Sequence, residues 1–320
     1  MSEAAADATS DATPDVAPTG AAATASGGTT VGVVGLGAMG GRAAARLAAA
    51  GPVVGYDLAP ERLEDAAVSG VAAARDAGEV AERADVVLVS LPEPADVTRL
   101  AEEVLAGRLR EGAVVVDIST IDPGSARTAA RAVASAGAAY VDAPVLGRPA
   151  ACGRWTLTAG GDAAAVDHVR PLLEGTIARA VVRIGDVGAG SVVKLLNNLM
   201  FGAINAVTAE VVAIAARAGV DPAVFVGTVA DSGAATVSGL FRELAPRIVA
   251  GDHEPTFALG LLEKDNRLAL ALARDSGTPS FIATAVDQVN RLALDQGLGE
   301  LDTGAVHRLY EALAADGTPA

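Results

Sequence analysis

Between residues 31 and 188, short apolar runs alternate with amphipathic, alanine-rich stretches. Apolar runs bounded by glycine, proline or aspartate predict buried strands, and apolar positions that recur about every 3.6 residues predict helices. The alternation predicts an α/β domain, a Rossmann-type doubly wound parallel sheet with helices on both faces and ligands beyond the carboxyl ends of its strands. The strand candidates are 31–35, 53–57, 85–91, 113–118, 139–143, 155–159 and 181–184. The helix candidates between them are 40–50, 60–68, 77–83, 95–106, 123–136 and 163–173.

The alternation stops after Gly188, and the rest of the chain shows the helical period alone. Residues 189–320 are therefore expected to form an all-helical domain. Its helix candidates are 190–218, 222–231, 238–250, 258–275, 280–295 and 303–314. Residues 1–30 have no periodicity and little apolar bulk, which predicts a disordered tail. This tail lacks the positive start and apolar stretch of a secretory signal.

The composition narrows the class of protein. The chain has 320 residues and a formal net charge of −15, which repels phosphate backbones and acidic lipids and so disfavours nucleic acid or membrane partners. Asn197, Asn205 and Glu210 interrupt the longest apolar stretch, so we expect no membrane span. A lone Cys152 excludes a disulfide framework and a cysteine-built metal site, and it fits a reducing cytoplasm.

A glycine-rich turn follows the first predicted strand and opens the first predicted helix. Gly35 allows the tight turn, Gly37 leaves room for a pyrophosphate, and Gly40 lets helix and strand approach closely. The free amides of the helix N-terminus would then face the anion. The predicted contacts of a dinucleotide are Gly35, Leu36, Gly37, Ala38, Met39 and Gly40.

Asp57 ends the second predicted strand, about twenty residues after the glycines, where a ribose 2′-hydroxyl is expected. A carboxylate there accepts hydrogen bonds from the ribose diol and repels a 2′-phosphate, which favours NAD over NADP. Arg62 leaves NADP open, because this side chain either stays solvated or turns towards a 2′-phosphate.

The chain has only two lysines, Lys194 and Lys264, beside 22 arginines. Arginine cannot release its proton in a protein, whereas the pKa of a desolvated lysine falls towards the working range. Lys194 lies among apolar neighbours with Asn198 one turn further along the same helix face, so it suits proton transfer. The alternative is a lysine on the helix surface. None of the three histidines lies beside a motif.

Several motifs together resemble the β-hydroxyacid dehydrogenase family, which includes 3-hydroxyisobutyrate dehydrogenase and tartronate semialdehyde reductase and is related to 6-phosphogluconate dehydrogenase. The resemblance spans residues 31–312 and implies reversible NAD(P)-linked oxidation of a 3-hydroxy acid at its C3 hydroxyl. The motifs are Gly35–Gly40, Leu91–Pro92, Ser119–Pro123, Asp142–Val145, Gly190–Asn198 and Lys264–Asp265.

The resemblance also implies residue roles. It makes Lys194 the proton donor and acceptor, and it lets Asn198 orient the substrate. It brings Lys264 across the cleft to the cofactor, although an ion pair with a neighbouring carboxylate is the alternative. It places Leu91 and Pro92 against the cofactor ribose, with Asp96 one turn later. It gives residues 189–320 the substrate and subunit contacts, and a homodimer or homotetramer is expected, as in the family.

The substrate loop departs from the family sequence Asp-Ala-Pro-Val-Ser-Gly-Gly, because Leu146 replaces the serine and Arg148 replaces a glycine. Gly147 can still present a backbone amide to a substrate carboxylate. Arg148 either clamps a carboxylate or phosphate or faces solvent. Ser119 and Thr120 end a strand at the ligand edge, so their hydroxyls are expected to contact nicotinamide or substrate. Their alternative role is to cap the next helix, for which Asp122 is better placed.

Two other functions share this architecture. Imine reductases generally lack the lysine, so Lys194 counts against that activity, while the altered loop keeps it open. A non-catalytic nucleotide sensor would not need Lys194, Asn198 and Lys264 together. The sequence therefore predicts a cytoplasmic 3-hydroxy acid dehydrogenase and leaves its substrate undetermined.

Overall fold

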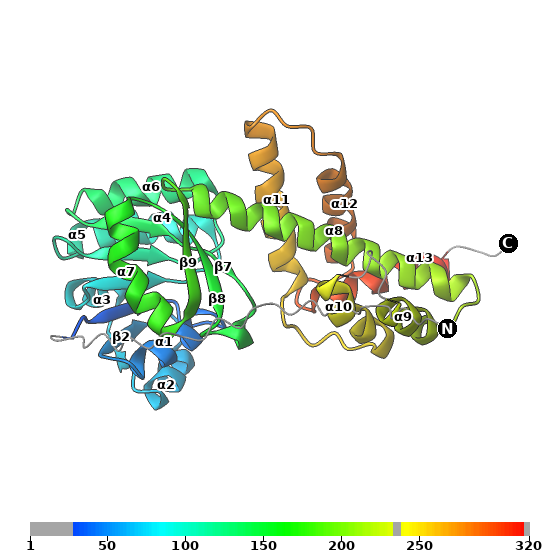
Figure 1. Ribbon diagram of the computed structural model, residues 1–320, viewed down its shortest axis with the longest axis horizontal. Coiled ribbons are helices and arrows are strands. Elements are labelled where there is room, and N and C mark those ends of the chain that lie inside the picture. Colours follow the sequence, from blue (N-terminus) through cyan, green and yellow to red (C-terminus); the bar gives the residue numbers. More distant parts are fainter. Residues whose placement is uncertain (1–27, 233–237, 317–320) are drawn as a thin grey trace, which may run out of the picture.

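The protein has two domains joined by one long helix, and a computed structural model describes residues 28–232 and 238–316. Figure 1 shows the α/β domain beside a bundle of helices, with α8 running from one into the other. Residues 1–27 of the predicted tail lie outside the described residues. The domain order predicted from the sequence is confirmed.

The α/β domain contains the first nine strands and seven helices of the described chain. Its strands are β1 (Val31–Val34), β2 (Val53–Tyr56), β3 (Ala72–Ala73), β4 (Val86–Val89), β5 (Val114–Asp117), β6 (Ala139–Asp142), β7 (Val145–Leu146), β8 (Trp155–Gly160) and β9 (Ala178–Gly185). Its helices are α1 (Gly40–Ala48), α2 (Pro60–Val68), α3 (Ala77–Arg83), α4 (Pro94–Leu100), α5 (Ala106–Arg108), α6 (Pro123–Ala134) and α7 (Ala163–Thr176). A π-helical turn, Ala101–Leu105, joins α4 to α5.

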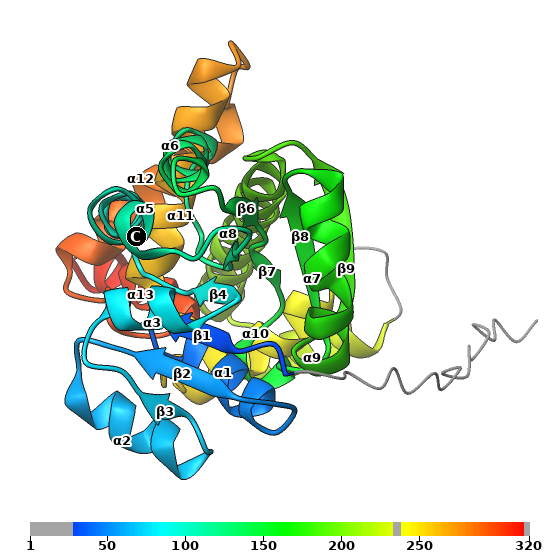
Figure 2. The same ribbon diagram turned by 90° about the vertical axis from the view of Figure 1, so that its left-hand side faces the viewer.

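The strands form one sheet in the order β3-β2-β1-β4-β5-β6-β8-β7, with β9 beside β8. Its central strands are apolar on both faces, so each face needs a layer of helices. Side chains of α1, α2 and α7 pack into one core, and those of α3, α4 and α6 into the other. Figure 2 shows α1 and α7 on the opposite side of the sheet from α3 and α6.

The sheet is mixed, whereas the alternation of strands and helices predicted a parallel one. Strands β1 to β6 are parallel, but β8 runs antiparallel to both β6 and β7. The reason is the short connection after β7, which holds only a single 3₁₀ turn, Pro149–Ala151, and no crossover helix. A parallel return needs a crossover of a dozen or more residues.

The helical domain begins with α8 and packs around its own core. Its helices are α8 (Ala189–Arg217), α9 (Pro222–Asp231), α10 (Gly239–Ala250), α11 (Leu259–Asp275), α12 (Phe281–Asp295) and α13 (Val306–Asp316). By length and composition α8 could cross a bilayer, but it contacts α10, α11 and α13 and buries Asn198, Asn205 and Thr208. With these contacts and buried polar side chains, α8 is the central helix of the packed helical domain.

Candidate active site

The turn between β1 and α1 is built from glycines because it is sterically crowded. Gly35 has a φ of 90°, which glycine adopts without strain. A Cβ on Gly40 would lie only 1.9 Å from the carbonyl oxygen of Gly35. The start of α1 can therefore approach the end of β1 only with glycine at position 40.

The same turn fits the diphosphate of a dinucleotide. Within the described residues, the amides of Gly37, Ala38 and Met39 donate no hydrogen bond, and the first turn of α1 has neither a side-chain cap nor an acidic residue. Free amides at a helix N-terminus attract an anion. The space over Gly37 is open except for the guanidinium of Arg62, whose Nη1 is 3.2 Å from an added Cβ.

Asp57 joins the end of β2 to this turn. Its Oδ2 accepts a 2.7 Å hydrogen bond from the Leu36 amide, and its Oδ1 accepts one of 2.9 Å from the Ala59 amide. The Nη1 of Arg62 lies 3.5 Å from Asp57 Oδ2. A ribose diol can therefore meet the carboxylate while a 2′-phosphate can meet the guanidinium, so the residues fit NAD and NADP.

The carboxyl ends of β4 and β5 are joined by Ser119. Its Oγ accepts a 2.9 Å hydrogen bond from the Leu91 amide, and its own amide donates to Asp117 Oδ1 at 2.9 Å. The Tyr140 hydroxyl donates to Asp117 Oδ2 at 2.6 Å, and burial raises the pKa of Asp117. The Ser119 oxygen thus accepts one backbone hydrogen bond in the structure, and Asp122 caps α6 through the Ser125 amide.

Lys264 extends from α11 to the α/β domain. Its Nζ donates to the carbonyl oxygens of Pro92 and Thr120, both at 3.0 Å, and lies 3.1 Å from Asp265 Oδ1. The side chain is buried. The ammonium therefore fixes the ends of β4 and β5 against the helical domain, and the ion pair expected as its alternative role is present as well.

Asp265 also orients the predicted substrate residue. Its Oδ2 accepts a hydrogen bond from Asn198 Nδ2, and both side chains are buried. Asn198 Oδ1 in turn accepts a 3.1 Å hydrogen bond from Asn197 Nδ2, so both ends of the Asn198 amide are held by neighbouring side chains. Sequence reasoning did not assign Asp265 a role, although it follows Lys264 directly.

The N-terminus of α8 is anchored to the sheet. Asp142, at the end of β6, accepts hydrogen bonds from the amides of Gly188 (2.7 Å) and Ser191 (2.8 Å). Burial raises the pKa of Asp142 to about 6, and these hydrogen bonds oppose the shift. Since the helix start is fixed, the side chains of the next turn are fixed as well.

Lys194 lies in that turn, where its ammonium makes no hydrogen bond or ion pair with any described residue. Burial lowers its pKa, Asp265 opposes this shift, and the charge of Lys264 adds to it. A partly buried amine with no permanent partner and a lowered pKa can exchange a proton with a ligand.

A cavity of about 1070 Å³ connects these groups at the carboxyl ends of the strands, between the two domains. Two predicted site residues are not in its wall: the Leu36 side chain packs into the sheet core, and Gly40 is buried at the start of α1. The predicted residues that line it are Gly35, Gly37, Ala38, Met39, Asp57, Leu91, Pro92, Asp96, Ser119, Thr120, Gly147, Arg148, Lys194, Asn198 and Lys264.

Aromatic and loop residues also line this cavity. Phe201 and Phe257 line it and meet edge to face at 5.6 Å. Gly147 and Arg148 line it too, and the guanidinium of Arg148 donates to Thr256 Oγ1 of the helical domain at 3.0 Å. The two phenylalanines were missed from the sequence, because nothing local distinguishes them from core residues.

Comparisons with known proteins match both domains of the chain to dehydrogenases. Residues 30–185 match the family described as the NAD binding domain of 6-phosphogluconate dehydrogenase. Residues 188–310 match a second family, described as NAD-binding of NADP-dependent 3-hydroxyisobutyrate dehydrogenase. The chain is 33% identical to an L-threonate dehydrogenase of Cupriavidus necator, over 90% of this chain and 98% of the relative. It is 34% identical to a 3-hydroxyisobutyrate dehydrogenase of Pseudomonas aeruginosa, over 88% and 98%.

The chain belongs to the 3-hydroxyisobutyrate dehydrogenase family. A solved 3-hydroxyisobutyrate dehydrogenase from Salmonella typhimurium is 31% identical and superposes with a TM-score of 0.80, over 88% of this chain and 99% of that one. As a 3-hydroxyisobutyrate dehydrogenase family member, the protein is an NAD(P)-dependent oxidoreductase that acts on the CH–OH group of 3-hydroxy acids. The predicted family, activity and cofactor class are confirmed.

Proposed function

We propose that Lys194 is the general acid and base of this dehydrogenase. The observation that supports the proposal is an unpartnered amine in the wall of the interdomain cavity, with a pKa lowered by burial. In oxidation, neutral Nζ accepts the proton of the substrate C3 hydroxyl. In reduction, the ammonium returns that proton to the C3 oxygen. A nicotinamide cofactor, when bound, would accept the hydride from C3 in oxidation and return it in reduction.

The remaining contacts follow from the same arrangement. Asn198, held by Asp265, orients the substrate hydroxyl beside Lys194. The backbone amide of Gly147 receives the substrate carboxylate at the other side of the cavity. Lys264 keeps the two domains together around the substrate, which excludes water during the transfer. A two-domain site of this kind orients the reactants before any bond changes.

The cofactor end is assigned to the glycine turn and the strand ends. Asp57 receives the ribose diol, which favours NAD, and Arg62 admits NADP. Leu91, Pro92 and Thr120 border the ribose and nicotinamide, since they end neighbouring parallel strands. Asp96 lies in the cavity wall one turn later and is paired with Arg99. In this assignment, residues 31–188 form the cofactor domain and residues 189–320 form the helical domain.

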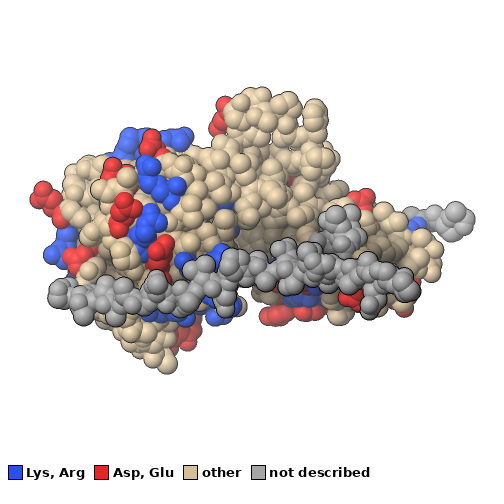
Figure 3. All heavy atoms as spheres, viewed as in Figure 1, with Lys and Arg blue, Asp and Glu red and all other residues tan. Residues whose placement is uncertain are grey.

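The helical domain is proposed to form a homodimer or homotetramer in the cytoplasm. The outward ridge of α8 exposes Leu196, Met200, Val207 and Ile214, with exposed fractions between 48% and 66%. Figure 3 shows few charged side chains on this face of the helical domain and many over the α/β domain. An apolar ridge of this length is typical of a subunit contact.

Replacing Lys194 tests the mechanism. In a panel of 3-hydroxy acids with NAD and NADP, Lys194→Met and Lys194→Arg are expected to reduce kcat/KM by about 10²–10⁴-fold, because neither side chain exchanges a proton near neutral pH. Cofactor affinity, measured by the fluorescence of the reduced cofactor, should stay within about twofold of the parent, since Lys194 is outside the cofactor contacts.

The pH dependence gives an independent readout. Oxidation needs the neutral amine, so its kcat/KM should rise with pH through the lowered pKa of Lys194, and reduction should fall over the same interval. Retained turnover in Lys194→Met would exclude the proton-transfer role. Imine reduction by the parent with no activity on 3-hydroxy acids would instead support the imine reductase alternative.

A further inference from the structure

Arg148 lies in the substrate loop, and hydrogen bonds hold its backbone in place. Its backbone oxygen accepts a 2.8 Å hydrogen bond from Trp155 Nε1, and Trp155 is fully buried. The Ala151 amide donates to the same oxygen at 3.0 Å, and Pro149 restricts the backbone that follows. The position from which the guanidinium extends is therefore fixed by the α/β domain.

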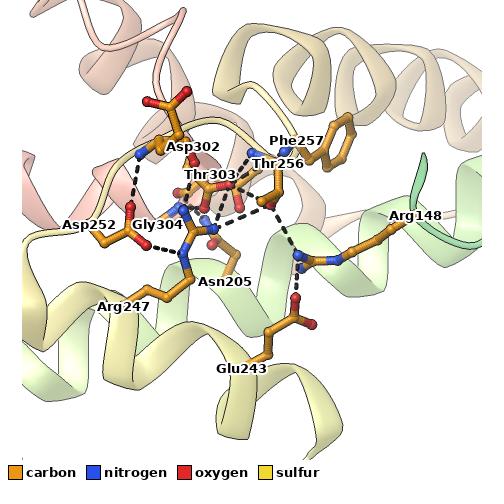
Figure 4. A network of polar contacts seen from close by, with 11 residues as sticks. Arg148, Asn205, Glu243, Arg247, Asp252, Thr256, Phe257, Asp302, Thr303 and Gly304 are labelled. Carbon is orange, nitrogen blue, oxygen red and sulfur yellow. Dashed lines mark hydrogen bonds and ion pairs between the residues drawn. The ribbon is translucent and has the colours of Figure 1, made fainter. Parts of the chain in front are cut away.

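The guanidinium crosses to the helical domain, as Figure 4 shows. It forms an ion pair with Glu243 of α10, and its Nη1 donates to Thr256 Oγ1 at 3.0 Å. Arg148 and Thr256 both line the cavity, whereas Glu243 does not. We name the Arg148–Glu243–Thr256 contact the interdomain latch.

The far side of the interdomain latch is rigid as well. The Thr256 amide and hydroxyl donate to Asp302 Oδ2 at 2.9 and 2.7 Å, and Arg247 Nη1 lies 3.1 Å from the same oxygen. The Asp302 side chain is buried, and its other oxygen accepts from the Gly304 amide. Thr256 is therefore held in place whether or not Arg148 contacts it.

The contact between Arg148 and Glu243, which joins these two fixed sides, is weak. The side chains of Arg148 and Glu243 are 31% and 48% exposed, and exposed ion pairs contribute little to stability because water and salt screen them. A weak contact between two fixed walls can open without unfolding either wall. When it is closed, it places the Arg148 guanidinium across the cavity wall between the two domains.

We propose that Arg148 is a specificity-determining residue, because the interdomain latch closes the substrate end of the cavity and limits the length of the 3-hydroxy acid that fits. This inference rests on the proposed function and deepens it. The guanidinium already has a carboxylate partner in Glu243, so the substrate carboxylate needs no contact with it. Arg148 acts as a wall, and the Gly147 amide keeps its role at the carboxylate.

The test compares matched variants on a homologous series of 3-hydroxy acids of increasing chain length. In Arg148→Ala, the ratio of kcat/KM for the longest acid to that for the shortest should rise about fivefold, the upper range for an exposed ion pair. Glu243→Gln should shift the ratio in the same direction, since it loosens the latch from outside the cavity. Arg154→Ala, an exposed arginine close by, should leave the ratio unchanged.

A clamp that binds the substrate carboxylate directly predicts opposite results and would overturn the proposal. Arg148→Ala would then raise KM for every acid alike, and Glu243→Gln would lower KM by freeing the guanidinium. Binding to the enzyme loaded with reduced cofactor, which cannot oxidise the acid, provides a readout without catalysis: in calorimetric titrations the affinity for the longest acid relative to the shortest should rise in both latch variants. A raised affinity ratio with no turnover of any acid in the parent would refute the proposed function alone, and an unchanged ratio would refute the latch.

Discussion

The two lysines of this chain differ in their partners. Lys264 has three oxygen atoms within 3.1 Å of its ammonium, whereas Lys194 has none among the described residues. A lysine whose donors are all satisfied holds structure together, and one without a partner is free to bind and release a proton. The scarcity of lysine in the sequence therefore marks two different tasks in one cavity.

Asp57 and Arg62 determine the choice of cofactor at the residue scale. Asp57→Asn removes the charge that repels a 2′-phosphate and frees Arg62 from its partner. The ratio of KM for NADP to KM for NAD should fall about fivefold, since an exposed charge pair contributes up to about 1 kcal/mol. Steady-state kinetics with both cofactors measures this ratio.

Arg62→Ala is the matched control and should change the same ratio in the opposite direction. Asn at position 57 still offers one oxygen to the Leu36 amide, so the glycine turn keeps its shape. Equal changes for NAD and NADP in both variants would show that neither side chain faces the 2′-position.

The site residues that the sequence could reveal were those with a local signal. The glycine turn has its spacing, and Lys194 stands out because arginine serves elsewhere. Asp265 and Phe257 have no such signal, since their importance depends on contacts with Asn198 and Phe201 far away in the chain. Arg148 was visible as a departure from the family sequence, but its partner Glu243 was not.

At the scale of elements, Asp142 couples α8 to the sheet, and this contact depends on pH. The folded state raises the pKa of Asp142 from 3.8 to about 6, so between these values the folded state binds more protons than the unfolded chain. The free energy of unfolding should therefore fall as the pH rises through this interval. Asp142→Asn should make that fall smaller, as measured by urea denaturation at several pH values.

Asp186→Asn is a suitable control, because Asp186 is fully exposed in the turn before α8 and should keep the parental slope. An identical slope for Asp142→Asn and the parent would mean that Asp142 titrates alike in both states.

Helices were easier to predict than strands. The ranges 60–68, 77–83 and 222–231 coincide with α2, α3 and α9, whose starts carry Pro60, Asp76 and Pro222 as local signals. The strands β3 and β7 have two residues each, too few to show a pattern. The antiparallel direction of β8 was not visible, because pairing is decided between segments and not within one.

At the scale of the whole molecule, the apolar ridge of α8 predicts subunit association. Met200→Asp with Val207→Asp places charges on two exposed positions of the ridge. Burying a charge in an interface is costly, so the molar mass in solution should fall from that of a dimer or tetramer towards a monomer. Light scattering coupled to size-exclusion chromatography measures it.

Val68→Asp is the control, because Val68 is 90% exposed on α2 of the other domain. Its mass should equal that of the parent. A monomeric parent would contradict the proposed assembly and leave the ridge without a subunit partner.

The single helix that carries Lys194 has an evolutionary consequence. Each residue of an α-helix turns the chain by about 100°, so deleting one position between Gly190 and Lys194 would aim the amine away from the cavity. Point substitutions on the outer surface of α8 leave that direction intact. A Cβ on Gly190 would lie 2.0 Å from the Thr158 carbonyl oxygen, so the start of this stretch is fixed in composition as well. Descendants of this gene therefore cannot change the number of residues between Gly190 and Lys194.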